Sequence, residues 1–136
     1  MITLAGVSVV YTGRHEVPVH ALDGINLEVG RGEWLGLVGG NGSGKSTLLN
    51  LMSALDTPSS GTITVNGTDV ARASRRANFK FRRETVGLIF QSFNLFPALT
   101  ALENVQFAVD MRGHKANGRA AQVLESVGLG QRIHHF

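Results

Sequence analysis

The sequence predicts an α/β fold built around a glycine-rich turn that joins a strand to a helix. Residues 33–39 (EWLGLVG) are mostly apolar, which is typical of a strand buried on both faces. Residues 40–44 (GNGSG) form the turn, and residues 46–55 carry apolar side chains at helical spacing. Upstream, residues 2–11 (ITLAGVSVVY) alternate between apolar and polar, as a half-buried strand does.

The remaining elements follow from local signals along the chain. INLEV at 25–29 predicts a short second strand, and GTITVNG at 61–67 predicts a strand that ends in an Asn-Gly hairpin turn. VGLIFQ at 86–91 predicts another strand. Thr100 and Glu103 have the spacing of a capping box, which predicts a helix from about Ala101. A last helix is expected over 117–127, ending at Gly128.

Composition excludes several classes of site and of protein. The chain has 136 residues, enough for one compact domain, and its 43% hydrophobic content provides a core. It contains no cysteine, so disulfides, thiolate metal sites and a cysteine nucleophile are excluded. The uncharged segment 86–102 is too short and too polar to predict a membrane span.

The segment from Gly39 to Ser46 fits the pattern G-x-x-x-x-G-K-[ST], which is typical of loops that hold a nucleotide polyphosphate. Glycines let successive backbone N–H groups turn toward one anion, and the dipole of the following helix points at the same place. Lys45 can reach the β- and γ-phosphates, and the Ser46 hydroxyl can bind Mg²⁺. The alternative is a glycine turn that only connects strand and helix.

Across essentially its whole length, the chain resembles the ATP-binding subunits of ABC transporters. The stretches that carry the resemblance are ALDGINLEVGRGEWLGLVGGNGSGKSTLLNLM, SSGTITVNGTDV, VGLIFQSFNLFPALTALENV and VLESVGLGQRIHHF. PVHALDGINL, LDTPSSGTI, FRRETVGLIFQ and LTALENV are most similar to the lipoprotein-releasing and macrolide-exporting group. Gly40 and Asn41 depart from the Pro-Ser usual in that group.

The resemblance implies a set of site residues. Tyr11 would stack on adenine, and Ser46 with Gln91 would bind Mg²⁺. Lys45 and Gln91 would support catalysis, with Gln91 near the attacking water. The cofactors implied are ATP and Mg²⁺. The ATP-binding residues expected are Tyr11, Gly39, Gly40, Asn41, Gly42, Ser43, Gly44, Lys45, Ser46 and Thr47.

The resemblance also implies a P-loop NTPase fold of the ABC type, with an antiparallel β subdomain and a RecA-like core, C-terminally truncated. Residues 1–136 would form a partial ATP-binding domain, with 1–91 as β subdomain and P-loop core and 92–136 as the start of the helical subdomain. The strand ending in Asp and Glu, the LSGGQ-type signature and the switch histidine are not found in the sequence. FAVD at 107–110 lies in a helical pattern, so it is not taken for that strand. We therefore expect no steady-state ATPase activity. Because missing flanking strands would leave apolar sheet edges exposed, we also expect poor solubility or a molten character of the isolated chain.

The expected partners are a transmembrane permease subunit and a second ATP-binding subunit, on the cytoplasmic face of the cell membrane. Phe93, Leu95, Phe96 and Leu99 form an apolar patch that would dock the permease or pack inside the helical subdomain. The run 72–83 holds six basic residues and no acid, which indicates a solvated face or a contact with anionic lipid or a membrane partner. Nucleic acid is not expected as a partner, and His134 with His135 lacks a third metal ligand.

Two alternative functions remain open at this stage. The chain could come from a non-transport ABC ATPase, of cell division or repair, or it could be a nucleotide-binding module without catalysis. Co-purification with a membrane permease separates the first alternative from a transporter subunit.

Overall fold

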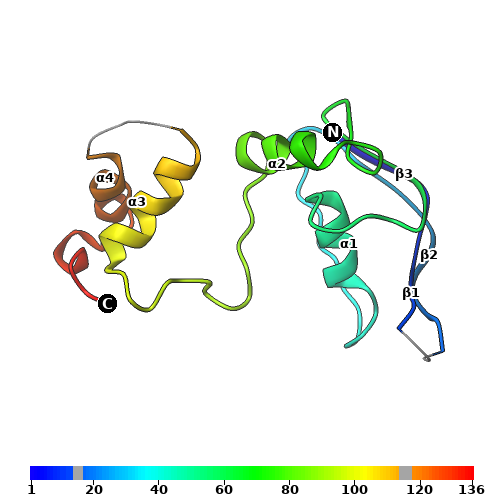
Figure 1. Ribbon diagram of the computed structural model, residues 1–136, viewed down its shortest axis with the longest axis horizontal. Coiled ribbons are helices and arrows are strands. Elements are labelled where there is room, and N and C mark those ends of the chain that lie inside the picture. The colour runs from blue at the N-terminus through cyan, green and yellow to red at the C-terminus, as the bar shows by residue number, and fades with distance from the viewer. Residues whose placement is uncertain (14–16, 114–117) are drawn as a thin grey trace. The chain divides into compact units, whose positions relative to one another are not determined.

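The chain folds into two units, Met1–Arg82 and Arg83–Phe136, in a computed structural model that describes residues 1–13, 17–113 and 118–136. The first unit contains the strands and the first helix, and the second contains α3, α4 and a short 3₁₀ helix (Figure 1). Helix α2 (Arg75–Glu84) reaches from the end of the first unit into the start of the second.

The first unit is built on an antiparallel four-stranded sheet in the order β2-β1-β3-β4. The strands are β1 (Ile2–Tyr11), β2 (Val19–Val29), β3 (Ser60–Val65) and β4 (Thr68–Asp69). Strand β1 lies in the middle and pairs along its length with β2, from Ile2 opposite Val29 to Tyr11 opposite Val19. The predicted strand at 25–29 is therefore the second half of a longer strand.

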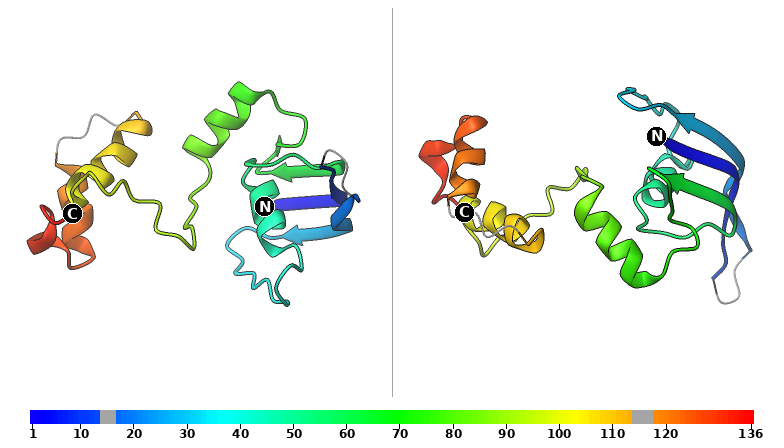
Figure 2. Two further views of the ribbon diagram at one scale, coloured as in Figure 1. Left: turned by 60° about the horizontal axis from the view of Figure 1, so that its bottom comes forward. Right: turned by 90° about the horizontal axis from the view of Figure 1, so that it is seen from above.

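One face of this sheet is covered by α1 (Lys45–Met52), which follows the glycine-rich loop (Figure 2). Strand β1 buries Leu4, Val7 and Val9, and a register shift between Leu4 and Val7 interrupts the predicted two-residue period. Helix α1 buries Leu48 and Leu51, which are three residues apart and so lie on one side of the helix. The buried apolar residues of this unit are Leu4, Val7, Val9, Leu22, Val29, Leu48, Leu51, Ala54, Ile63, Val65, Val70 and Phe81.

The predicted Asn-Gly hairpin is confirmed. Asn66 and Gly67 join β3 to β4 with φ angles of 47° and 80°. Both angles are positive, as the tight two-residue turn requires. The hairpin places Val65 and Val70 in the core on either side of the turn.

The second unit is helical, with α3 (Ala101–Met111), α4 (Arg119–Ser126) and the 3₁₀ turn η1 (Gly130–Arg132). The predicted capping box is confirmed: Thr100 Oγ1 accepts from the amide of Glu103, and the Glu103 carboxylate accepts from the amide of Thr100. Residues 107–110 lie inside α3, so FAVD is helical as expected. Gly128 follows α4 with a φ of 77°, which ends this helix as predicted.

The predicted buried strands at 33–39 and 86–91 are wrong for this structure, because neither segment forms a strand. Trp34 and Ile89 are fully exposed, and Val38 nearly so. A strand of a parallel sheet is held by hydrogen bonds from neighbours on both sides. Among the residues that the structure describes, neither segment has such a neighbour, so its apolar side chains face solvent.

None of the helices in the described parts of the chain combines the length and the hydropathy needed to cross a bilayer. The uncharged run at 86–102 ends in the first turn of α3 and has no helix before Ala101.

Candidate functional site

The glycine-rich loop leads directly into α1, and two of its glycines adopt left-handed backbone angles. Gly42 has a φ of 75° and Gly44 a φ of 85°. An L-residue with a side chain is strained in this region, so the loop depends on glycine at both positions. The result is a tight reversal of the chain at the amino end of the helix.

Gly44 also lies against the sheet. A Cβ atom built on it would come within 2.6 Å of the carbonyl oxygen of Ala21 and 2.7 Å of a methyl group of Leu22, both in β2. The loop therefore rests directly on the backbone of β2. This close approach fixes where the first turn of α1 begins.

The Lys45 ammonium is directed back into the loop. Its Nζ donates to the carbonyl oxygens of Gly39 (2.8 Å) and Gly40 (2.6 Å) and to Oγ of Ser43 (3.2 Å). A cation held by loop carbonyls and surrounded by exposed glycine backbone is placed to meet an anion that enters the loop.

The amino end of α1 is open to an anion. Gly44 occupies the N-cap and offers no side chain to the first amides, and the first turn contains no acidic residue. The first intrahelical bond runs from the amide of Leu48 to the Gly44 carbonyl, so the amides before it have no partner four residues back in the helix. These amides and the helix dipole attract negative charge. Ser46 is exposed in this turn, and Thr47 is half-buried.

A cavity of about 190 Å³ lies beside the loop, lined by apolar residues of β2 and of the segment before the loop, together with Lys45. It is smaller than the roughly 300–1,000 Å³ of typical ligand pockets. The loop therefore offers a surface cradle of backbone amides, and the adjoining cavity does not define the ligand.

Tyr11 ends β1 with its side chain 44% exposed. Its hydroxyl donates to Oδ2 of Asp56 at 2.7 Å. This hydrogen bond, and to a smaller extent burial, raises the pKa of the Tyr11 phenol, while the Thr47 hydroxyl acts in the opposite sense. Tyr11 therefore lies close to the first turn of α1. Asp56 was missed by the sequence-based reasoning, although an Asp before Thr-Pro in a turn is a recognisable signal.

Gln91 lies in the second unit, where it is exposed in a bend. The structure brings Tyr11, the loop and Thr47 together within the first unit, and it describes Gln91 separately from them. The roles of Gln91 toward Mg²⁺ and water stay predictions.

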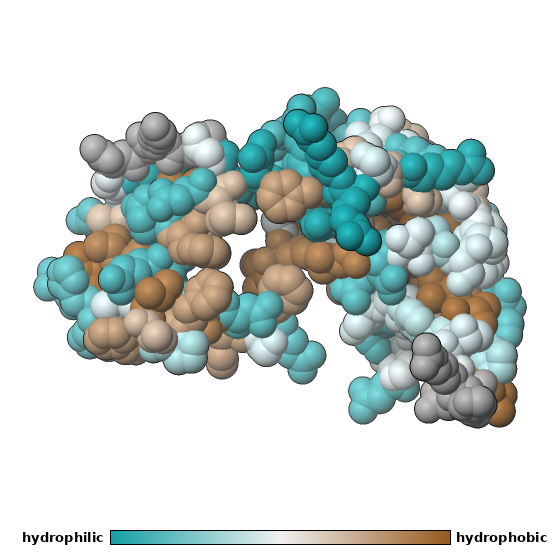
Figure 3. Space-filling view, in the orientation of Figure 1, coloured by the Kyte–Doolittle hydropathy of each residue, from teal (hydrophilic) through white to brown (hydrophobic). Residues whose placement is uncertain are grey.

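Most of the basic run lies in α2, where its residues differ in their contacts. Phe81 is buried, and the Arg82 guanidinium donates to the carbonyl of Ala54 at 2.6 Å, so this side packs on the first unit. Arg75 and Arg76, in the first turn of α2, are exposed. The surface over α2 is strongly hydrophilic, teal at the top of Figure 3. The solvated-face interpretation fits this arrangement, and the lipid or partner contact stays a prediction.

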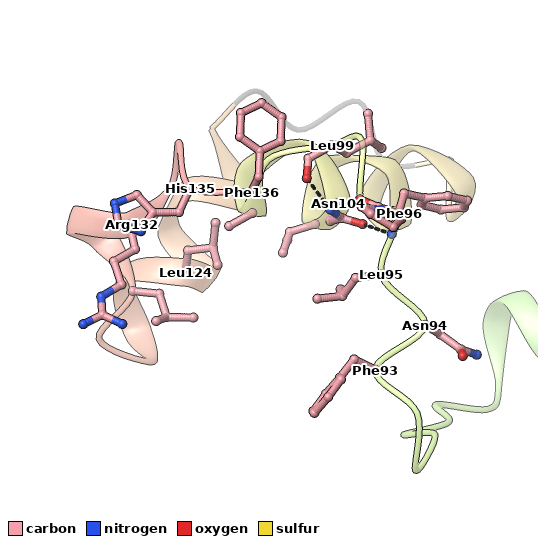
Figure 4. A pocket seen from close by; sticks show the side chains of 14 residues that line it. Phe93, Asn94, Leu95, Phe96, Leu99, Asn104, Leu124, Arg132, His135 and Phe136 are labelled. Atoms are coloured by element: carbon pink, nitrogen blue, oxygen red, sulfur yellow. Dashed lines mark hydrogen bonds between the residues drawn. The ribbon is translucent and has the colours of Figure 1, made fainter.

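In the second unit, the segment before α3 lines a cavity of about 720 Å³ together with α3, α4 and the C-terminal residues (Figure 4). Phe93 is 89% and Leu95 64% exposed at its edge. Phe96 packs edge-to-face on Phe107, with ring centroids 5.0 Å apart. The apolar patch is thus partly packed and partly open to solvent.

Asn104 holds this segment in place, and the sequence-based reasoning missed it. Its Oδ1 accepts from the amide of Phe96 at 2.8 Å, and its Nδ2 donates to the carbonyls of Phe96, Leu99 and Thr100 (Figure 4). One asparagine thereby satisfies four backbone groups of a segment without secondary structure.

The C-terminal residues close the amino end of α3. The amides of Ala101 and Leu102 donate to the carbonyls of His135 (2.8 Å) and Ile133 (2.9 Å). In the parts of the chain that the structure describes, no three His, Cys, Asp or Glu residues come together as a metal site. The backbone carbonyl of His135, which accepts from the Ala101 amide, contributes to the fold of the second unit.

A protein-family model described as ABC transporter matches residues 22–136 of the chain. The chain is 45% identical over 123 residues to an uncharacterized ABC transporter ATP-binding protein of Thermotoga maritima, which covers 88% of this chain and 53% of that protein. It is 44% identical to the lipoprotein-releasing system ATP-binding protein LolD of Geobacter metallireducens, over 90% of this chain and 56% of that one. It is 42% identical to the macrolide export ATP-binding/permease protein MacB of Azoarcus sp., over 99% of this chain and 21% of that one.

The fold is similar to solved structures as well. A dimeric, post-hydrolysis structure of the ATP-binding cassette MJ0796 bound to ADP and Pi matches 98% of this chain and 60% of its own, with a TM-score of 0.88 and 34% identity. The chain thus spans little more than half the length of the ATP-binding relatives and of the solved cassette.

Proposed function

Because the chain belongs to the ABC transporter family of ATP-binding proteins, we propose that it binds Mg²⁺-ATP at the loop from Gly39 to Thr47, as part of a subunit whose ATP hydrolysis drives export or release of a substrate. The observation that carries the proposal is the Lys45 ammonium, directed into a glycine cradle at an uncapped helix end. A triphosphate is the ligand that such a lysine and such amides match. Tyr11, next to the same helix, would hold the adenine ring.

Ser46 fits a magnesium ligand. It is exposed at the first turn of α1, and a hydroxyl oxygen is the hard donor that Mg²⁺ prefers. Bound Mg²⁺ would neutralise phosphate charge. Within this chain, Lys45 would bind the β- and γ-phosphates, and Gln91 would complete the metal site from the glutamine-containing segment.

We further propose the partition that the family resemblance implies: residues 1–91 as β subdomain and phosphate-loop core, and residues 92–136 as the start of the helical subdomain. The partners would be a second ATP-binding subunit and a transmembrane permease. Two features of similar proteins support these partners: the solved MJ0796 cassette is dimeric, and the name of MacB includes a permease. The cavity with Phe93 and Leu95 at its edge is the surface where the permease would dock.

A subunit with these partners would act at the cytoplasmic face of the cell membrane. Non-transport ABC ATPases share the same loop chemistry, and co-purification with a permease separates the two. The transport assignment rests on the relatives' names, lipoprotein release and macrolide export.

Calorimetric titration of the chain with Mg²⁺-ATP tests the proposal. Lys45→Ala removes charged hydrogen bonds of roughly 1.5–3 kcal/mol, so we expect Kd to rise about 10- to 150-fold. Arg76→Ala is the matched control, because it removes one exposed cation of the same unit and should leave Kd unchanged. Equal affinity of wild type and Lys45→Ala would contradict binding at this loop.

A further inference from the structure

The turn that follows α1 ties this helix to the end of β1. Ser53 Oγ donates back to the carbonyls of Leu49 and Asn50 and closes the helix. The amide of Ser59 then donates to the carbonyl of Ser8 at 2.9 Å. Residues 53–59 therefore bridge the helix that carries the phosphate loop and the strand that carries Tyr11.

A second pair of contacts fixes the end of β1. The amide of Val10 donates to Oγ of Ser59 at 3.0 Å, so the backbone next to Tyr11 is held by the turn. The hydroxyl of Tyr11 donates to Oδ2 of Asp56 at 2.7 Å. Both ends of the tyrosine, its backbone and its phenol, are thus attached to structure.

Asp56 is itself held in place. Its other carboxylate oxygen, Oδ1, accepts from the amide of Thr57 at 2.8 Å, and its own amide donates to the Asn50 carbonyl of α1 at 3.3 Å. A carboxylate anchored at the end of α1 therefore holds the phenol of Tyr11, a residue that is 44% exposed. The ring of Tyr11 keeps an accessible surface while its hydroxyl is fixed.

We propose that Asp56 is a positioning residue for nucleotide binding, whose carboxylate holds the Tyr11 ring at a set distance from the phosphate loop so that the base and the phosphates of one nucleotide bind together. The inference rests on the proposed function, in which Tyr11 carries the base. Without Asp56 the phenol loses its 2.7 Å hydrogen bond to a fixed carboxylate, so the ring is held less firmly and binding must order it. Ordering one side chain on binding costs a factor of about three to ten in affinity.

Affinities for Mg²⁺-ATP and for Mg²⁺-tripolyphosphate, which has no base, test this role. Asp56→Ala should weaken ATP about three- to tenfold and leave tripolyphosphate unchanged. Asp56→Asn should keep most of the ATP affinity, because the phenol can donate to or accept from an amide. Tyr11→Phe should match Asp56→Ala, and the double variant should lose no more than either single one. Asp23→Ala, at an exposed aspartate of β2, is the control.

Tyr11 is the only tyrosine of the sequence, so phenol absorbance against pH reports on it alone. Removing the carboxylate should lower the pKa of Tyr11 in Asp56→Ala. An unchanged pKa, or equal losses for ATP and tripolyphosphate, would overturn the positioning role. Tyr11→Ala is a separate test of the base platform. If it keeps the wild-type preference for ATP over tripolyphosphate, the base does not bind Tyr11 and the proposed function fails at that point. If only Asp56→Ala has no effect, the positioning role alone fails.

Discussion

Replacement of Gly44 by alanine tests the claim that the phosphate loop is fixed by its close approach to β2. The new Cβ would meet the Ala21 carbonyl oxygen at 2.6 Å, a backbone atom that cannot turn aside, and a methyl of Leu22 at 2.7 Å. Overpacking of this kind costs about 1–3 kcal/mol. The left-handed φ of 85° adds about 1–2 kcal/mol. Gly44→Ala should therefore destabilise the first unit by about 2–5 kcal/mol.

Gly42→Ala is the matched control. Its φ of 75° carries the same backbone strain, but nothing lies within 4 Å of the new Cβ. It should cost only about 1–2 kcal/mol. Urea unfolding followed by far-ultraviolet circular dichroism measures both variants, and the difference of about 1–3 kcal/mol isolates the contact with β2. Equal free energies of unfolding for the two variants would refute the reasoning.

Three further predictions follow from other contacts. The Glu103 carboxylate accepts hydrogen bonds from the Thr100 amide and hydroxyl, and these bonds lower the pKa of Glu103. The cap of α3 is therefore complete above the ordinary glutamate pKa, and it is lost as pH falls through the lowered pKa. Helicity measured against pH should fall in that acid range, and Thr100→Ala should remove most of this dependence. Asn104→Ala leaves the Phe96 amide and the Leu99 carbonyl without their partner and should destabilise the second unit by about 1–3 kcal/mol, seen in hydrogen exchange of residues 96–100. Unchanged exchange would contradict this role of Asn104. The purified chain should not turn over ATP at steady state, because its sequence holds no strand ending in Asp and Glu; turnover that Lys45→Ala abolishes would contradict this.

The features that the sequence predicted correctly are set by neighbouring residues. The capping box needs only Thr100 and Glu103, and the hairpin needs only Asn66 and Gly67. Each is decided by local hydrogen bonds and by the backbone angles that those residue types allow. The alternation in β1 predicts the burial of Val7 and Val9, while the register shift after Leu4, which depends on pairing with β2, was not predicted.

The strands predicted at 33–39 and 86–91 depend on partners that are distant in sequence. Their apolar composition predicts burial on both faces, and burial requires neighbouring strands that the described residues do not supply. The solved MJ0796 cassette, of which this chain covers 60%, matches the chain with a TM-score of 0.88. The backbone of this chain follows the path of the solved cassette, although the segments 33–39 and 86–91 do not form strand hydrogen bonds.

The candidate site was predicted only as far as its motif extends. The spacing of Gly39, Gly44 and Lys45 predicts the loop, because the chemistry of phosphate binding dictates it. The bond from Tyr11 to Asp56 joins residues 45 positions apart, and no local pattern encodes it. The same holds for the approach of Gly44 to Ala21, which depends on how β2 lies under the loop.

Nuclear magnetic resonance of the labelled chain during titration with Mg²⁺-ATP tests the central claim most directly, since it locates the ligand residue by residue. The account predicts that the backbone amides from Gly42 to Thr47 shift most, with a smaller effect at Tyr11, and that these shifts disappear in Lys45→Ala. Saturable shifts confined to residues 93–136, or a loop unaffected by millimolar nucleotide (about the weak end of specific affinities), would contradict it.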